Sequence, residues 1–151
     1  MSRRIATIGF GEKSAERFVR LLRDAGVVTV VDTRRWPDAP DAGYARQRDL
    51  PFLLSSAANV GYEHRPEVAP PSKLLDRYAR DEDWAGYVRD FEELVLASPN
   101  AKRAMTELLA RSGNEMMALL CLEPTPQRCH RRLIAERMQE FDASLELIHL
   151  V

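Results

Sequence analysis

The stretch VVTVVD, residues 27–32, decides the fold of this chain. Its β-branched residues run without apolar–polar alternation, a pattern typical of a strand buried on both faces of a parallel sheet. The segment IATIG, residues 5–9, has the same character, and residues 14–25 between the two have the apolar spacing of a helix. Two strands joined by a helix form a βαβ unit, so we expect them to be parallel with a right-handed crossover.

The rest of the chain continues this alternation. Helical spacing and cap residues predict further helices over residues 48–58, 72–78, 84–97, 99–111 and 126–141, with N-caps at Ser72, Ser98 and Thr125. Apolar runs predict further strands over residues 62–65, 116–122 and 145–150, and the prolines of residues 35–43 predict a loop. The pattern predicts one α/β domain over residues 1–151, with about five mainly parallel strands flanked by helices.

Composition limits the class of protein. The chain has 151 residues, of which 45% are hydrophobic and 30% charged, as in an ordinary globular domain. No stretch approaches the roughly 18 apolar residues of a membrane span, and no apolar segment follows the N-terminus as in a signal peptide. We therefore expect a cytoplasmic protein without a membrane partner. The net charge of −1 gives no overall attraction to nucleic acid, although it does not exclude such a partner.

Reactive residue types are densest in the stretch ALLCLEPTPQRCHRRLIA, residues 118–135. It contains the candidates Cys121, Glu123, Cys129, His130 and Arg131. An expected buried strand ends here and a helix begins, and ligands bind at such positions in open α/β sheets. An N-cap at Thr125 would put Cys129 in the first turns of the helix, where the dipole favours anions and lowers a thiol pKa. Two cysteines in a cytosolic chain are expected to be free thiols, metal ligands or redox groups.

Polar residues at other strand ends extend the candidate site. Asp32 and Arg34 follow the second strand, at the edge of the sheet where Gly9 and Cys121 are expected. A carboxylate and a guanidinium there are expensive to bury unless they pair with each other. Gly9 would let the backbone approach a ligand closely or form a tight turn, and His64 follows the third strand. We predict Gly9, Asp32, Arg34, His64 and Arg131 as substrate-binding residues.

Three functions remain open at this stage. The first is an enzyme for an anionic substrate such as a nucleotide, phosphate or carboxylate; Cys121 or Cys129 supplies a thiol, and Glu123 or His130 transfers protons. The second is a non-catalytic ligand-binding or regulatory module, in which Cys121 packs in the core and Glu123 forms a buried ion pair with Arg131 or Arg34. The third is a zinc or iron protein that binds metal through Cys121, Cys129 and His130, although their spacing matches no standard structural zinc pattern. The sequence identifies no cofactor and no oligomeric state.

Five motifs occur in order along the chain. They are TIG at residues 7–9, VDTRRWP at 31–37, YEHRPE at 62–67, the cysteine block at 120–135 and IHL at 148–150. In these motifs the chain resembles the domain-of-unknown-function 488 family, over nearly its whole length. The resemblance implies a small bacterial or archaeal cytoplasmic α/β domain, and it implies no particular reaction.

Three positions depart from the family pattern. Phe10 stands where histidine or tyrosine is usual, and Thr33 stands where valine is common. Residues 68–70, Val-Ala-Pro, replace the glycine pair that many members have after this point. The cysteine block is intact, so these departures concern the N-terminal half of the expected site.

Overall fold

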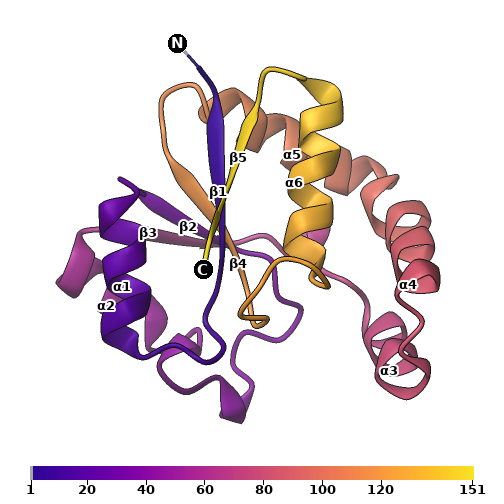
Figure 1. Cartoon of the computed structure of the whole chain (residues 1–151), viewed down its shortest axis with the longest axis horizontal. Helices are drawn as coiled ribbons and strands as arrows, with labels where there is room; N and C mark the ends of the chain where they lie inside the picture. The colour runs from indigo at the N-terminus through magenta and orange to yellow at the C-terminus, as the bar shows by residue number, and fades with distance from the viewer. Residues whose placement is uncertain (1) are drawn as a thin grey trace.

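A five-stranded sheet runs through the computed structural model, which describes residues 2–151 (Figure 1). The strands are β1 (Arg4–Gly9), β2 (Thr29–Asp32), β3 (Gly61–His64), β4 (Met117–Cys121) and β5 (Glu146–Leu150). Their order is β3-β2-β4-β1-β5, and every neighbouring pair is parallel. The expected α/β fold with about five parallel strands is confirmed.

Strand β4 separates the two strands of the N-terminal βαβ unit. β1 and β2 are parallel, as expected, but each pairs with β4 rather than with the other. All five residues of β4 are buried, because neighbours and helices enclose the strand on every side. The register pairs Gly9 with Cys121, and Asp32 with both Leu120 and His64. The polar strand ends named above therefore meet at one edge of the sheet.

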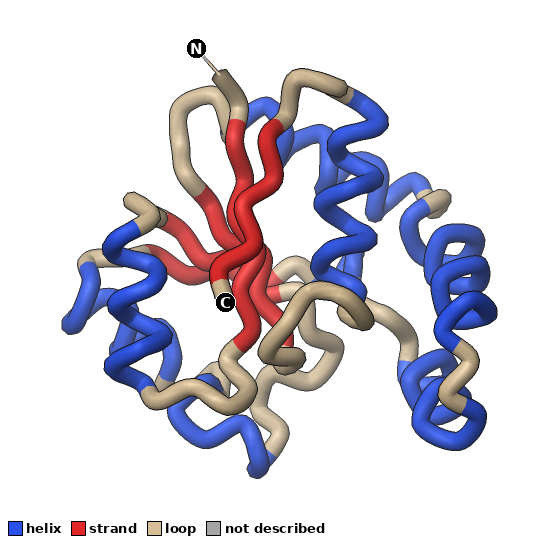
Figure 2. Tube along the Cα trace, in the orientation of Figure 1, coloured by secondary structure: helices blue, strands red, loops and turns tan. Residues whose placement is uncertain are grey.

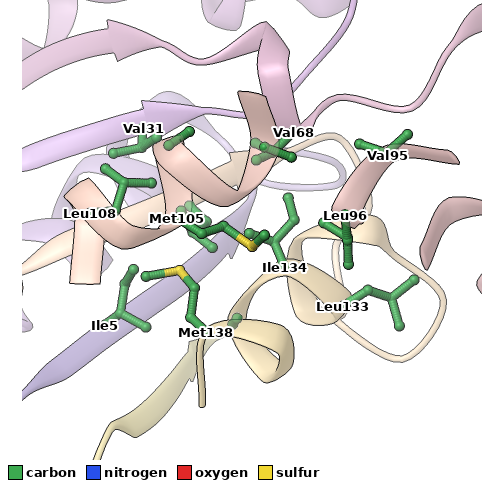
Figure 3. Close-up of a cluster of buried hydrophobic side chains, with 14 of the residues drawn as sticks. Ile5, Val31, Val68, Val95, Leu96, Met105, Leu108, Leu133, Ile134 and Met138 are labelled. Atoms are coloured by element: carbon green, nitrogen blue, oxygen red, sulfur yellow. The ribbon is translucent and has the colours of Figure 1, made fainter. Parts of the chain in front are cut away.

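Helices cover both faces of this sheet (Figure 2). They are α1 (Ala15–Asp24), α2 (Leu50–Ala58), α3 (Ser72–Asp81), α4 (Trp84–Phe91), α5 (Pro99–Arg111) and α6 (His130–Phe141), with short 3₁₀ helices at Pro40–Ala45 and Pro66–Val68 and a π-helical turn at Glu92–Leu96. α1 and α2 pack on one face of the sheet, and α3 to α6 pack on the other. The hydrophobic core between the sheet and helices α3 to α6 contains Met105 of α5 and Ile134 and Met138 of α6 (Figure 3).

Helix α6 begins later than its sequence predicts. The N-cap is Cys129, with extended backbone angles, and the expected cap at Thr125 is wrong. The reason lies in the carbonyls of the preceding loop, which bond arginine side chains instead of helical amides. Arg132 donates to the carbonyls of Pro126 and Gln127 at 3.1 and 2.9 Å, which keeps this part of the loop out of the helix.

Smaller differences concern other helix ends. Pro71 occupies the cap position of α3, so Ser72 is its first helical residue and not its cap. Ser98 caps α5 as expected, accepting a hydrogen bond from the amide of Ala101. The single helix expected over residues 84–97 is divided into α4 and the π-helical turn, and the loop over residues 35–43 includes a 3₁₀ helix. Within residues 2–151 no helix is both long and apolar enough to cross a membrane.

Candidate functional site

A cavity of about 320 Å³ opens at the carboxyl edge of the sheet, beside the ends of β2 and β4 and the start of α6. Its reactive and charged lining consists of Arg34, Arg35, Asp41, Cys121, Glu123, Arg128, Cys129 and His130. Its aromatic lining consists of Phe10, Trp36, Tyr78, Trp84 and Tyr87. The cavity thus combines sulfur, positive charge and aromatic surface in a volume that suits a small ligand.

The two cysteines lie on either side of the loop that connects β4 to α6. Cys121 is the last residue of β4, and Cys129 caps α6. The structure joins them in a disulfide, so the expectation of free thiols is wrong for this state of the protein. Each cysteine is almost entirely buried, and the cavity is the space that both of them face.

Arg131 supports the sulfur of Cys121 from within the protein. It is completely buried, and its Nη1 donates to Cys121 Sγ at 2.9 Å and to the Glu123 carbonyl at 2.8 Å. Burial lowers the pKa of this guanidinium to about 10, with the nearby Glu123 acting in the opposite direction. A positive charge against the sulfur stabilises negative charge on Cys121 when the disulfide is reduced. Arg131 does not line the cavity, so it acts on a ligand only through Cys121.

Gly9 makes room for this arrangement. A Cβ atom at Gly9 would overlap the carbonyl oxygen of Glu123 and would lie 2.6 Å from its carbonyl carbon. The close approach brings the Glu123 carbonyl within reach of Arg131. Gly9 therefore accommodates a loop of the protein itself, and it does not line the cavity.

Asp32 and Arg34 form a buried, bidentate ion pair. Arg34 Nε and Nη2 donate to the two carboxylate oxygens at 2.8 and 2.7 Å, and the Tyr62 hydroxyl donates to the same carboxylate. Burial, more than this carboxylate, raises the pKa of Tyr62. Arg34 Nη2 also donates to the Ala45 carbonyl at 2.7 Å, and Nη1 is buried without a partner among the described residues. The Arg34 side chain lines the cavity, with its guanidinium carbon 5.0 Å from the centroid of the Phe10 ring.

His130 is held as a neutral ring. Its Nε2 lies 2.9 Å from the Thr33 carbonyl and 3.0 Å from Thr33 Oγ1, which itself donates to the Leu120 carbonyl. We assign the proton to Nε2 because the carbonyl can only accept, so Nδ1 is an acceptor. Burial lowers the pKa of His130 to about 4, although the Thr33 hydrogen bond opposes this shift. Near pH 7 the ring is therefore a base or a ligand, and not an acid.

The buried imidazole predicts a pH dependence of stability. Between pH 6.5 and about 4 the unfolded chain binds a proton at His130 that the folded chain does not, so stability falls as the pH falls. We expect this residue alone to account for a loss of roughly 3 kcal/mol across that interval. Urea unfolding of wild type and His130→Gln, with chelator present, should show a steeper acid loss in wild type. Parallel stability profiles of the two proteins would contradict the assignment.

Two sequence candidates remain, Glu123 and His64. The Glu123 side chain is exposed at the cavity, and the expected buried ion pair with Arg131 or Arg34 is wrong: Arg131 bonds the Glu123 backbone carbonyl, and Arg34 pairs with Asp32. His64 Nε2 lies 2.7 Å from the Arg34 carbonyl and fixes the backbone after β2, outside the cavity. The structure therefore brings five candidates together in the lining of the cavity: Arg34, Cys121, Glu123, Cys129 and His130. The other four candidates, Gly9, Asp32, His64 and Arg131, do not line it.

Sequence reasoning missed the arginine and aromatic walls of the cavity. Arg35 donates to the carbonyls of Ala69 and Pro70, and Arg128 is exposed with no hydrogen-bond or ion-pair partner within residues 2–151. Trp84 and Tyr87 stack with ring centroids 5.0 Å apart. The helical spacing of apolar residues in α4 predicted core packing, and Tyr87 is indeed buried. The spacing did not predict that the Trp84 and Tyr87 rings also line a cavity. The position of Trp36 next to two arginines was the available signal.

Comparison with known proteins gives one match. The chain matches the family described as domain of unknown function DUF488 over residues 14–138. No curated protein and no solved structure matches it. The matched segment includes β2, β3, β4 and most of α6, and with them all the cavity-lining residues except Phe10. The chain therefore belongs to the DUF488 family.

Proposed function

We propose that this protein is a thiol-dependent enzyme that binds a small anionic substrate in the cavity beside Cys121 and Cys129. One observation carries the proposal: the two sulfurs share a cavity with Arg34, whose buried Nη1 has no hydrogen-bond partner among the described residues. A buried guanidinium with a free donor is expensive unless something accepts from it. An anionic ligand would supply that acceptor next to the sulfurs.

The lining of the cavity narrows the ligand class. Arg128, which has no hydrogen-bond or ion-pair partner within residues 2–151, would add a positive charge that no carboxylate pairs with, unlike Arg34 with its partner Asp32. Stacked Trp84 and Tyr87, with Trp36 nearby, offer flat apolar surface for a planar group. A planar ring that carries a phosphate or carboxylate, as in a nucleotide, fits this combination best.

The cysteine pair would provide the chemistry in its reduced form. One thiolate attacks an electrophilic atom of the substrate, and the leaving group departs with the electron pair of the broken bond. The second thiolate then attacks the first sulfur, forming the Cys121–Cys129 disulfide and releasing the product reduced by two electrons. His130, whose ring is neutral near pH 7, would accept a thiol proton at Nδ1 during these steps. A cellular dithiol would return the disulfide to its reduced form.

A second function is favoured by the burial of the cysteines. Both are almost inaccessible and bonded to each other, as in a purely structural cross-link. In that case the domain would be a non-catalytic ligand-binding or regulatory module with the same cavity. The two functions differ in whether the sulfurs react with a small reagent inside the cavity.

Alkylation of the reduced, chelator-treated protein separates these functions. Iodoacetate is anionic and iodoacetamide is neutral, and each transfers its carbon to sulfur with loss of iodide. An anion-binding cavity should raise the iodoacetate-to-iodoacetamide rate ratio at Cys121 or Cys129 about tenfold above that of glutathione, since one charge-assisted hydrogen bond supplies enough energy. Mass spectrometry of the alkylated peptides identifies the cysteine that reacts.

Two arginine variants test where this preference comes from. Arg128→Gln should lower the rate ratio several-fold, because Arg128 lines the cavity. Arg103→Gln changes an exposed arginine of α5 outside the cavity lining and should leave the ratio unchanged. A wild-type ratio equal to that of glutathione would contradict the proposed enzyme, and cysteines that resist both reagents would favour the structural module.

A further inference from the structure

We propose that the reduced protein binds a divalent metal ion of the zinc type through Cys121, Cys129 and His130, with one coordination position open to the cavity. The proposal concerns the same cavity as the proposed function but does not require that function. Its observation is a cluster of three ligand atoms, two sulfurs and one ring nitrogen, that lie within 4.8 Å of one another.

The distances suit a tetrahedral ion. Zinc binds thiolate sulfur at about 2.3 Å and histidine nitrogen at about 2.0 Å, so two sulfurs on one tetrahedral ion lie roughly 3.8 Å apart. Once the disulfide is reduced, the two sulfurs must move apart. A sulfur–sulfur distance of roughly 3.8 Å is still shorter than the 4.8 Å within which the three ligand atoms lie. The three residues also come from fixed positions, the end of β4 and the first turn of α6, which hold them together without a long flexible loop between ligand and scaffold.

Two of the ligands have supporting contacts of the kind that metal sites use, and the third lies at a helix N-terminus. The Thr33 carbonyl fixes the His130 proton on Nε2, and Nδ1 is therefore the atom available to a metal. Arg131 Nη1 donates to Cys121 Sγ and stabilises its thiolate form. Cys129 caps α6, where the helix dipole favours a negative sulfur. These features favour the thiolate and neutral imidazole forms that a metal requires.

The ligand set resembles that of catalytic zinc rather than structural zinc. Structural sites use four protein ligands, whereas catalytic sites use three and leave one position for water or substrate. Within residues 2–151 the cluster contains no fourth histidine, cysteine or carboxylate. All three ligand residues line the cavity, so the fourth position faces the space where an anionic ligand would lie. Such a ligand could then bind the metal and Arg34 together.

Formation of the site requires reduction. A dithiol reductant transfers two electrons and two protons to the disulfide, giving two thiols and the oxidised reductant. The divalent ion then displaces the two thiol protons and binds two thiolates and neutral His130. The oxidised and reduced forms of one chain therefore differ in whether the site exists.

Cobalt(II) titration of the 151-residue protein tests the proposal. Reduced wild type should bind one equivalent, with a cobalt–thiolate charge-transfer band and the intense visible bands of tetrahedral cobalt, and zinc should displace the cobalt stoichiometrically. Oxidised wild type should give neither spectrum, and this comparison does not depend on whether any variant folds. Cobalt bound without the thiolate band, or bound equally by the oxidised protein, would overturn the site.

Variants assign the ligands. Cys121→Ser, Cys129→Ser and His130→Gln should each weaken zinc binding on the order of 100-fold, because loss of even a supporting contact costs 10- to 100-fold. His149→Gln changes a histidine of β5 that lies outside the cluster and should leave the affinity unchanged. Unchanged affinity in folded cysteine variants would exclude these ligands. The alkylation test uses metal-free protein, so it can contradict the proposed enzyme without affecting the proposed metal site. The cobalt titration can likewise contradict the metal site alone.

Discussion

Gly9→Ala is expected to lower the free energy of unfolding by about 3 kcal/mol, the upper end of the usual cost of overpacking a packed interior. The added Cβ would overlap the carbonyl oxygen of Glu123, which belongs to backbone and cannot rotate away as a side chain can. Relief requires the loop between β4 and α6 to move. Movement would break the hydrogen bond from Arg131 to that carbonyl, and with it the support of Cys121.

Denaturant unfolding in a fixed redox state measures this effect. Gly113→Ala is the matched control, because the atom nearest to a Cβ there is the Arg3 side chain at 3.7 Å, an ordinary contact. The control should change stability by less than about 1 kcal/mol. If Gly9→Ala were as stable as Gly113→Ala, the close approach of the two backbone segments would be wrong.

Asp32→Asn is expected to destabilise the protein by about 4 kcal/mol. The substitution keeps the shape of the side chain but leaves the Arg34 guanidinium buried without its counter-charge. The Tyr62 hydroxyl would lose its charged acceptor as well. The loss should appear as a lower denaturation midpoint with an unchanged slope, since the surface exposed on unfolding stays the same.

A second substitution distinguishes charge imbalance from general disruption. Adding Arg34→Met to Asp32→Asn removes the uncompensated guanidinium and should restore part of the lost stability, so the two effects are non-additive. Asp24→Asn at the exposed end of α1 serves as the control and should change stability by less than about 0.5 kcal/mol. Additive losses in the double variant would mean that Asp32 and Arg34 act independently.

Local sequence patterns predicted most elements of the fold because their physical causes are local. Ser14 caps α1 through the amide of Arg17, and Ser98 caps α5 in the same way. The β-branched run of β2 indicated a strand with both faces covered, and the two cores on either side of the sheet confirm it. Such features depend on side-chain shape and on hydrogen bonds over three or four residues.

The start of α6 could not be predicted in this way. Thr125 and Pro126 have the local signature of an N-cap. The loop carbonyls instead accept hydrogen bonds from Arg131 and Arg132, and the N-cap of α6 is Cys129. One arginine side chain can donate to several loop carbonyls at once. The spacing of apolar residues in the sequence does not predict these hydrogen bonds. The later start places Cys129 at the cap, the position on which the proposed chemistry and the proposed metal site depend.

By itself, the sequence determined the α/β class, the strands, and the cluster of Cys121, Glu123, Cys129 and His130 near one strand end, because periodicity and residue chemistry are local properties. Only the tertiary structure decided that β4 inserts between β1 and β2, which brings Arg34 and the cysteines to one cavity. It also decided that Arg131 supports a sulfur from behind and that aromatic rings of α3 and α4 face the cavity. The physical reason is that these contacts join segments distant in sequence, and only packing across the sheet selects which side chains meet.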